Sequence, residues 1–401
     1  MPIPASAYYW GSHAPPVSRL NLFATAHPGF EPVLARELEA LGQGPLCIEP
    51  GGVGFEADHG GLLWANLQLR TAGRILVRVA EFRARTFPEL ERHANKIDWA
   101  PYLASGVGIH LRVTSKKSRL YHERGIGERL AKTLVGDFPE AVIVPSRSDT
   151  DAEEHSVVDL PTVQRFVVRF HRDLCTVSAD SSGPLLHRRG YRLEIGKAPL
   201  RETFAAAVLL ATNWDPAMPL VDPFCGSGTI PIEAAMIARR IAPGLARRFS
   251  LERWSSFPPP DVDVARAKAR AQIRAAAETP ILGADRDAGV ILAAGRNAIR
   301  AGVGADVEWR SQAISALELP ARFGWIVTNP PYGTRVGERV ALRNLYAQLG
   351  KVLRDRAVGW HVGMLSPDPM LEGQTKLDWS PVAEGENGGI AIRLLTTQVA
   401  V

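Results

Sequence analysis

Apolar and polar positions along residues 20–183 alternate between the period of a strand and the period of a helix, in two similar cycles. Pro32 in a first turn and Gly42 at an end delimit the first helix. This alternation predicts two small α+β units in succession. The predicted strands are 20–26, 51–57, 74–84, 108–117 and 164–180, and the predicted helices are 31–42, 61–70, 87–97 and 125–138.

After residue 201 the pattern changes to single strands separated by helices of about 10–15 residues. This order predicts a doubly wound, mostly parallel sheet that binds ligands beyond the carboxyl ends of its strands. Residues 241–264, which contain a PPPD turn, are interpreted as an insertion. The predicted strands are 219–224, 280–287, 306–312, 324–329 and 359–367, and the predicted helices are 202–213, 229–240, 289–302 and 344–355.

The composition is that of a soluble globular chain, with 46% hydrophobic and 22% charged residues. Residues 1–20 lack the segments of an export signal, and no run of 18 apolar residues occurs. We therefore expect a loose tail over 1–20 and a cytoplasmic protein without membrane contact. Cys47, Cys175 and Cys225 lie far apart without ligand spacing, so we expect neither disulfides nor a metal site.

Nearly all of the net charge of +5 comes from one short segment. Residues 184–201 carry five basic side chains and one acidic side chain, among glycines and prolines that break helices. We interpret 184–200 as an interdomain linker with a basic face, with a merely solvated linker as the alternative. The basic residues are Arg188, Arg189, Arg192, Lys197 and Arg201.

The strand that ends at Asp222 runs into the loop DPFCGSGT, in which Gly226 and Gly228 allow backbone to approach a ligand. The loop has Pro231 where a dinucleotide fingerprint has its third glycine, and it lacks the lysine of a phosphate-binding P-loop. An acidic residue beside bare backbone suits a ligand with positive groups and a ribose, such as S-adenosylmethionine. The glycines alone would also fit an ordinary tight turn.

Two acidic residues, Asp285 and Asp287, follow the next strand. A carboxylate at the tip of the second strand can accept two hydrogen bonds from a ribose diol. Asp287 fits better as the N-cap of the following helix. We therefore assign the ribose to Asp285.

The fourth strand of the C-terminal half ends in TNPPYG, residues 328–333. The amide oxygen of Asn329 and the carbonyl of Pro330 are two acceptors that can hold both hydrogens of a planar exocyclic amine. This geometry turns the nitrogen lone pair toward a methyl sulfonium, and Pro330 and Pro331 stiffen the turn. Tyr332 offers a ring on which a base can stack.

Residues 187–235, together with GADRD, NAIRAG and TNPPYG, closely resemble the THUMP-domain methyltransferases, above all the bacterial large-subunit ribosomal RNA guanine-N2 methyltransferases. The resemblance covers about residues 20–390. It implies an α/β fold, with a Rossmann-like class I methyltransferase domain over 201–401. It also implies a preceding ferredoxin-like unit over 21–85 and a THUMP RNA-binding domain over 86–183.

By this resemblance, Glu202 and Thr203 match the segment that closes over S-adenosylmethionine, and TNPPYG matches the segment that holds the target amine. Near the third strand, Gln312 stands where relatives usually place an Asp that contacts the adenine. Either the amide oxygen of Gln312 supplies that contact, or the affinity for the cofactor is lower. The expected cofactor-binding residues are Asp222, Phe224, Gly226, Gly228, Thr229, Asp285, Glu202 and Thr203. The expected catalytic residues are Asn329, Pro330, Pro331 and Tyr332.

We expect methyl transfer to an exocyclic amine of RNA, with guanine N2 of 23S ribosomal RNA favoured and no obligate protein partner. The alternatives are a transfer RNA guanine-N2 methyltransferase and a catalytically idle RNA-binding or ribosome-assembly factor. DNA adenine-N6 methyltransferases share the NPPY arrangement but have no counterpart to residues 21–183. The expected RNA-binding residues are Lys116, Lys117, Arg119, Arg188, Arg189 and Arg192, with scattered solvated side chains as the alternative and the arginines of 239–253 as the next candidates.

Overall fold

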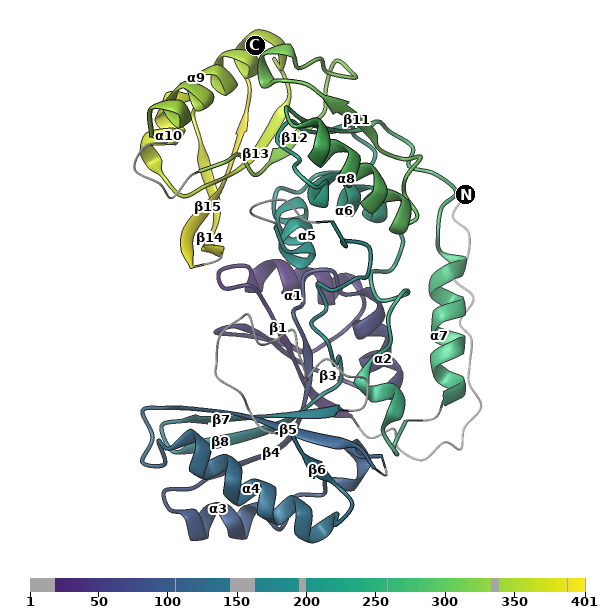
Figure 1. The fold of residues 1–401 in the computed structure, drawn as a ribbon, viewed down its shortest axis with the longest axis vertical. Helices are drawn as coiled ribbons and strands as arrows, with labels where there is room; N and C mark the ends of the chain where they lie inside the picture. The colour runs from purple at the N-terminus through teal and green to yellow at the C-terminus, as the bar shows by residue number, and fades with distance from the viewer. Residues whose placement is uncertain are drawn as a thin grey trace.

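The computed structural model of the 401-residue chain describes residues 19–104, 106–144, 163–194, 200–257, 259–332, 339–387 and 389–400. Two sheets with their helices follow one another along the long axis of the molecule (Figure 1). The tail predicted over residues 1–20 lies outside the described residues apart from its last two, and Leu20 begins the first strand. Within the described part of the chain, no helix is long and apolar enough to cross a membrane.

The first sheet runs through both N-terminal units without a break. Its elements are β1 (Leu20–Thr25), α1 (Glu31–Ala40), β2 (Leu46–Glu49), β3 (Gly52–Ala57), α2 (His59–Gln68), β4 (Ile75–Arg83), α3 (Phe87–Ala94), η1 (Ala100–Tyr102), β5 (Gly108–Lys116), α4 (Glu123–Asp137), β6 (Val142–Ile143), β7 (Val163–His171) and β8 (Leu174–Asp180). The strand order is β2-β3-β1-β4-β8-β7-β5-β6. Because β4 pairs with β1 on one side and β8 on the other, the two predicted units share this sheet.

A tight turn interrupts the long strand predicted over residues 164–180. The chain reverses at Arg172 and Asp173, both with left-handed backbone (φ 51° and 64°), so β7 and β8 form a hairpin. Two-residue hairpin turns of this kind usually contain Asn-Gly or Asp-Gly. Here the Asp173 N–H donates to Ser118 Oγ at 3.0 Å, and its carboxylate accepts from the Arg119 N–H at 2.8 Å. The prediction of one strand was wrong because contacts with the loop after β5 stabilise an unusual turn sequence.

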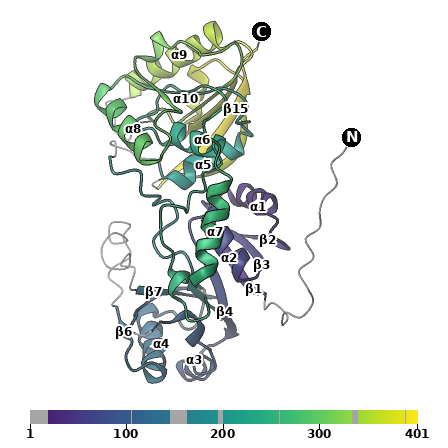
Figure 2. The same ribbon diagram turned by 90° about the vertical axis from the view of Figure 1, so that its right-hand side faces the viewer.

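The segment interpreted as an insertion belongs to the core of the N-terminal block. Its helix α7 (Pro259–Ala271) packs on α2, and Figure 2 shows it running beside that helix. Where the PPPD turn was expected, Pro259 begins α7, since proline is tolerated in a first helical turn, and Pro258 lies outside the described residues. Phe249 and Trp254 are buried among N-terminal side chains, and Trp254 Nε1 donates to Gln164 Oε1 at 2.8 Å.

The second sheet confirms the predicted doubly wound fold class. Its elements are α5 (Glu202–Ala211), β9 (Leu220–Asp222), α6 (Thr229–Ala238), η3 (Ser250–Arg253), β10 (Ile281–Asp285), α8 (Ala288–Arg300), β11 (Glu308–Ser311), η4 (Ile314–Ala316), β12 (Trp325–Thr328), α9 (Arg339–Arg356), β13 (His361–Ser366), α10 (Pro369–Gln374), β14 (Ser380–Asn387) and β15 (Ile390–Gln398). The order is β11-β10-β9-β12-β13-β15-β14, in which only the pairs formed by β15 are antiparallel. The loops after β9, β10 and β12 therefore meet at one edge.

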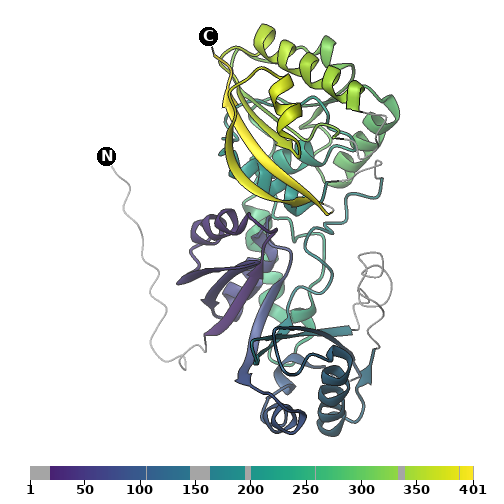
Figure 3. The same cartoon turned by 90° about the vertical axis from the view of Figure 1, so that its left-hand side faces the viewer.

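The N-terminal and C-terminal blocks pack directly on each other. Phe30, which precedes α1, is buried in the C-terminal core, and its ring lies edge-on to that of Phe204 at 5.1 Å. Gly29 (φ 85°) lies against the β14–β15 hairpin, where an added Cβ would be 1.6 Å from the carbonyl oxygen of Glu384. Figure 3 shows this hairpin crossing the C-terminal block above the N-terminal block.

Candidate active site

In the loop after β9, two glycines leave the backbone uncovered by side chains, as the sequence predicted. Gly226 and Gly228 have positive φ values of 52° and 87°, and Gly228 precedes the first residue of α6. An added Cβ at Gly228 would lie 2.6 Å from the Trp309 ring and 2.9 Å from Ala294. Side chains larger than hydrogen are therefore excluded at Gly228 by both conformation and packing.

Asp222 joins this loop to the strand that carries the TNPPYG motif. Its Oδ1 accepts from Thr328 Oγ1 at 2.6 Å and from the Phe224 N–H at 3.1 Å. Burial raises the pKa of Asp222 to about 7, because these two hydrogen bonds offset desolvation only in part and Asp285 adds a small repulsion. Thr328 is fully buried at the end of β12, so the two motifs are held in one register.

Asp285 bonds to the same loop from β10. Its Oδ2 accepts from the Gly226 N–H at 3.1 Å, and its Oδ1 accepts from the Asp287 N–H at 3.0 Å. Each carboxylate oxygen can accept a second hydrogen bond, so the capacity to bind a diol remains. The expectation for Asp287 is confirmed, because its side chain caps α8 by accepting from the Gly289 N–H at 2.8 Å.

Glu202 is the first residue of α5, and its two carboxylate oxygens differ in their hydrogen bonding within the described residues. Oε1 accepts from Arg192 Nε at 3.1 Å, whereas Oε2 is buried without a hydrogen-bond partner among the described residues. Burial raises the pKa of Glu202, and the Arg192 charge opposes that rise. Thr203, the next residue, is half-buried.

In the described part of TNPPYG, one side-chain oxygen is free to accept a hydrogen bond. Asn329 Oδ1 is buried and has no hydrogen-bond partner within the described chain. Pro330 is buried, Pro331 is exposed and Tyr332 is half-buried, with its hydroxyl accepting from Asn387 Nδ2 at 2.9 Å. Gly333, the last residue of the motif, lies outside the described residues.

Two of the linker arginines, Arg189 and Arg192, turn inward, contrary to the prediction that they extend an RNA-binding surface. Arg189 is buried in an ion pair with Glu233 on α6, and the Arg192 guanidinium bonds Glu202 and the Leu200 carbonyl. The prediction that Arg189 and Arg192 bind RNA is therefore wrong, because both are engaged by acceptors inside the protein. Arg188 is half-buried, and Lys197 lies outside the described residues.

Two of the second-choice arginines are engaged as well. Arg247 donates to the Leu185 carbonyl at 2.7 Å, and Arg239 donates to the Arg274 carbonyl at 2.9 Å. The bond from Arg247 fixes the insertion against the linker backbone, whereas Arg239 lies at the end of α6, before the insertion. Of the expected RNA-binding residues, Lys116, Lys117 and Arg119 are exposed.

Some site residues were missed by sequence reasoning. Asn297 on α8 is fully buried, and its Nδ2 donates to the carbonyl of Ser227 at 3.1 Å and to that of Glu194 at 2.9 Å. It thereby ties the cofactor loop to the end of the linker. Asn297 lies in NAIRAG, a segment that carried the family resemblance but to which we assigned no role. Nothing in the sequence indicated that Asn387 is the partner of Tyr332.

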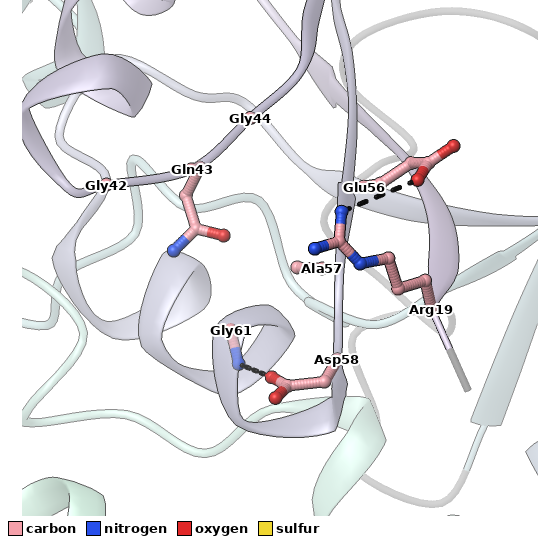
Figure 4. A pocket seen from close by; sticks show the side chains of 8 residues that line it. All are labelled: Arg19, Gly42, Gln43, Gly44, Glu56, Ala57, Asp58 and Gly61. Carbon is pink, nitrogen blue, oxygen red and sulfur yellow. Dashed lines mark hydrogen bonds and ion pairs between the residues drawn. The ribbon is translucent and has the colours of Figure 1, made fainter. Parts of the chain in front are cut away.

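A separate pocket of about 350 Å³ lies in the N-terminal block, between the turn after α1 and the start of α2 (Figure 4). Its polar groups are already used: Arg19 lies 3.8 Å from Glu56, and Asp58 caps α2 by accepting from the Gly61 N–H at 2.7 Å. None of the motif residues lines this pocket. It is therefore not part of the candidate active site.

The residues at the carboxyl edge of the second sheet fit S-adenosylmethionine. Glu202 Oε2 and Gln312 Nε2 are buried polar atoms without hydrogen-bond partners among the described residues. Such orphaned atoms are rare in proteins unless a ligand or water satisfies them. Gln312 lies beside Asp285, because its N–H donates to the Asp285 carbonyl at 2.9 Å, and the Asp285 carboxylate in turn accepts from the Gly226 N–H of the glycine loop. A side-chain amide, a carboxylate that can bind a diol and a glycine loop therefore lie together at this edge.

The raised pKa of Asp222 predicts that cofactor affinity depends on pH. A cationic ligand favours the carboxylate, so below pH 7 binding must first remove a proton. We expect the apparent Kd for S-adenosylmethionine to weaken about tenfold between pH 8 and pH 6. Calorimetric titration should show this dependence flattened in Asp222→Asn and retained in Asp215→Asn. An equal pH dependence in Asp222→Asn would contradict the assignment.

Comparisons with known proteins identify the family of the chain. The family model described as "RMKL-like, methyltransferase domain" matches residues 189–393, and the "RlmL ferredoxin-like domain" matches residues 21–76. A Synechocystis sp. protein with the provisional name RNA methyltransferase slr0064 is 34% identical over 93% of this chain and 95% of its own length. The ribosomal RNA large subunit methyltransferase K/L of Syntrophotalea carbinolica is 33% identical over 95% of this chain, but over only 54% of its own length.

The fold comparison points to the same cofactor. The crystal structure of SMU.472, described as a methyltransferase complexed with SAH, has a TM-score of 0.84 and 31% identity, covering 96% of this chain and 99% of that one. SAH, S-adenosylhomocysteine, is the product left after methyl transfer, so the cofactor of this protein is S-adenosylmethionine. The chain thus belongs to the RMKL-like methyltransferase family.

Proposed function

We propose that this protein transfers the methyl group of S-adenosylmethionine to an exocyclic amine of RNA, namely guanine N2 of large-subunit ribosomal RNA. The observation that carries the proposal is the buried Oδ1 of Asn329, which has no hydrogen-bond partner in the described part of the chain and is held beside the cofactor loop by the Thr328–Asp222 hydrogen bond. An acceptor of this kind matches an amine hydrogen. The names of relatives that act on RNA favour RNA over DNA.

The residues of the motif would act mainly by positioning the target amine. Asn329 Oδ1 and the Pro330 carbonyl accept its two hydrogens, which turns the nitrogen lone pair away from the ring plane and toward the methyl group. When bound, S-adenosylmethionine supplies an electrophilic methyl group. Transfer would form the nitrogen–methyl bond as the carbon–sulfur bond breaks, and the proton of the amine would be lost to water. No strong base is needed.

The N-terminal block is proposed to capture the RNA, through a ferredoxin-like unit over 21–85 and a THUMP domain over 86–183 that the linker 184–200 joins to the transferase domain 201–401. Exposed cations meet at one end of its sheet, because Lys116 at the end of β5 pairs with His171 next to the β7–β8 turn. Arg83, at the end of β4, donates to the Arg172 carbonyl at 3.4 Å in the same turn. These residues form the basic end of the sheet: Arg83, Lys116, Lys117, Arg119 and Arg172.

Charge reversal at this end should weaken RNA binding. Changing Lys116, Lys117 and Arg119 together to Glu removes up to three phosphate contacts, so the slope of log affinity against log salt should become flatter by about two to three. Cofactor affinity should not change. Fluorescence anisotropy with ribosomal RNA fragments at several salt concentrations measures both effects, and Lys268→Glu with Arg270→Glu on α7 is the matched control. Unchanged binding by the triple variant would place the RNA elsewhere.

The identity of the RNA is tested by mass spectrometry of nucleosides from a strain that lacks the gene. Loss of N2-methylguanosine from 23S ribosomal RNA is expected, with restoration by the wild-type gene but not by Asn329→Ala. Loss from transfer RNA alone would reverse the choice of substrate. Restoration by Asn329→Ala would support a binding or assembly factor in place of an enzyme.

A further inference from the structure

The β14–β15 hairpin touches the proposed base-stacking residue from a distant part of the sequence. Asn387, the last residue of β14, donates from Nδ2 to the Tyr332 hydroxyl at 2.9 Å. The two residues are separated by 55 positions. No motif links them, because Asn387 lies far beyond TNPPYG.

The ring of Tyr332 needs such a contact to hold one orientation. Pro330 and Pro331 fix the backbone before it, but the ring still turns about two side-chain bonds. Tyr332 is half-buried, and it lies near the fully buried Tyr346 of α9, whose pKa is raised well above its usual range chiefly by burial and to a lesser degree by Tyr332. The hydrogen bond at the ring tip therefore restricts where the free face of the ring points.

The hairpin that carries Asn387 is itself anchored at both ends of its strands. The second part of β15 pairs with β13, from Arg393 opposite Ser366 to Gln398 opposite His361. Gly385, two residues before Asn387, lies so close to the N-terminal block that an added Cβ would be 2.5 Å from the Pro28 carbonyl oxygen. Contacts of the hairpin with the sheet of the transferase domain and with the block that is proposed to capture RNA thus both fix the position of Asn387.

We propose that Asn387 is a positioning residue, which orients the Tyr332 ring so that a flipped base can stack on it beside Asn329. This inference rests on the proposed function, since the stacked base is the target base of the RNA. Asn387 does not touch the reacting atoms. Its effect passes through Tyr332, because the hydroxyl is the group that it bonds.

Kinetics of four variants test the coupling between the two side chains. A hydrogen bond of this kind is worth about 0.5–1.5 kcal/mol, so Asn387→Leu should lower kcat/KM for RNA about threefold to tenfold. Tyr332→Phe should cause a similar loss, and the double variant should be no worse than either single variant. Asn387→Asp should restore activity, because its carboxylate accepts from the Tyr332 O–H. Cofactor affinity and the thermal unfolding midpoint should stay near those of the wild type.

A second readout does not depend on turnover. In protein labelled with 3-fluorotyrosine, the ¹⁹F signal of Tyr332, assigned by its absence in Tyr332→Phe, should shift in Asn387→Leu and return in Asn387→Asp. Glu386→Ala, an exposed neighbour on β14, should leave that signal and the kinetics unchanged. If wild-type protein methylates no RNA while the signal responds to Asn387, the positioning stands and the substrate proposal fails.

The inference itself is overturned by three results. One is an active wild-type enzyme in which Asn387→Leu changes neither the ¹⁹F signal nor kcat/KM. Another is a double variant whose loss equals the product of the two single losses. The third is an Asn387→Asp variant as impaired as Asn387→Leu, because that would show that packing of the amide, and not its hydrogen bond, matters.

Discussion

Replacing Asn329 by alanine should lower kcat for RNA methylation by roughly 10²–10³-fold, equivalent to about 2.7–4 kcal/mol of barrier, as for the loss of one preorganised transition-state hydrogen bond. Asn329 Oδ1 is buried without a partner among the described residues, so it is ready to bind an amine without first losing another hydrogen bond. The affinity for S-adenosylmethionine should remain, because Asp222, Asp285 and the glycine loop are unchanged. Single-turnover methyl transfer and calorimetric titration measure the two quantities separately.

Asn21→Ala on the exposed side of β1 is the control for this experiment, and it should leave both quantities unchanged. Asn329→Asp keeps an acceptor at the same place, so its rate should exceed that of Asn329→Ala. Equal rates for Asn329→Ala and the wild type would remove Asn329 from the catalytic set. A large loss of cofactor affinity would instead make Asn329 a cofactor residue.

Replacing Arg189 by methionine should lower the free energy of unfolding by about 3–5 kcal/mol, the cost of breaking a buried ion pair from one side. Arg189 Nη1 donates to Glu233 Oε2 at 2.7 Å, and the two side chains are 1% and 0% exposed. Arg189 Nη2 also donates to the Arg70 carbonyl at 2.6 Å, which ties the linker to the N-terminal block. Without Arg189, the Tyr191 hydroxyl, at 2.8 Å, is the one side-chain donor to the Glu233 carboxylate that remains among the described residues.

Urea denaturation followed by circular dichroism measures this effect. The double variant Arg189→Met with Glu233→Leu should recover most of the loss, because it removes both charges and keeps the volume. Arg124→Met, in an exposed pair with Glu128, should change stability by less than about 1 kcal/mol. A single Arg189→Met variant as stable as the wild type would show that the linker is not held by this pair.

Local patterns predicted the transferase block well because its chemistry and its fold use contiguous segments. Asp222, Gly226 and Gly228 sit in one loop, and Thr328–Tyr332 follow one strand, so spacing alone brought them to the sheet edge. The N-cap role of Asp287 is equally local, and the structure confirms it. The bonds within this edge, such as that from Thr328 to Asp222, then follow from parallel pairing of β9 with β12.

The features that were not predicted depend on contacts between distant segments. The turn at Arg172 and Asp173 depends on Ser118, and the burial of Arg189 depends on Glu233 of α6. A basic run in a linker is as compatible with a solvated face as with buried ion pairs, since charge alone does not say what surrounds it. Asn387 could not be predicted either, because its contact with Tyr332 depends on the β14–β15 hairpin, which is distant in the sequence.

Transfer of tritiated methyl from S-adenosylmethionine by the purified protein tests the central claim most directly. The substrate is total RNA from the strain that lacks the gene, and the labelled nucleoside is identified after digestion. The account predicts label in N2-methylguanosine of 23S ribosomal RNA, and strongly reduced label with Asn329→Ala. Measurable cofactor binding without transfer to any RNA in this mixture would contradict it.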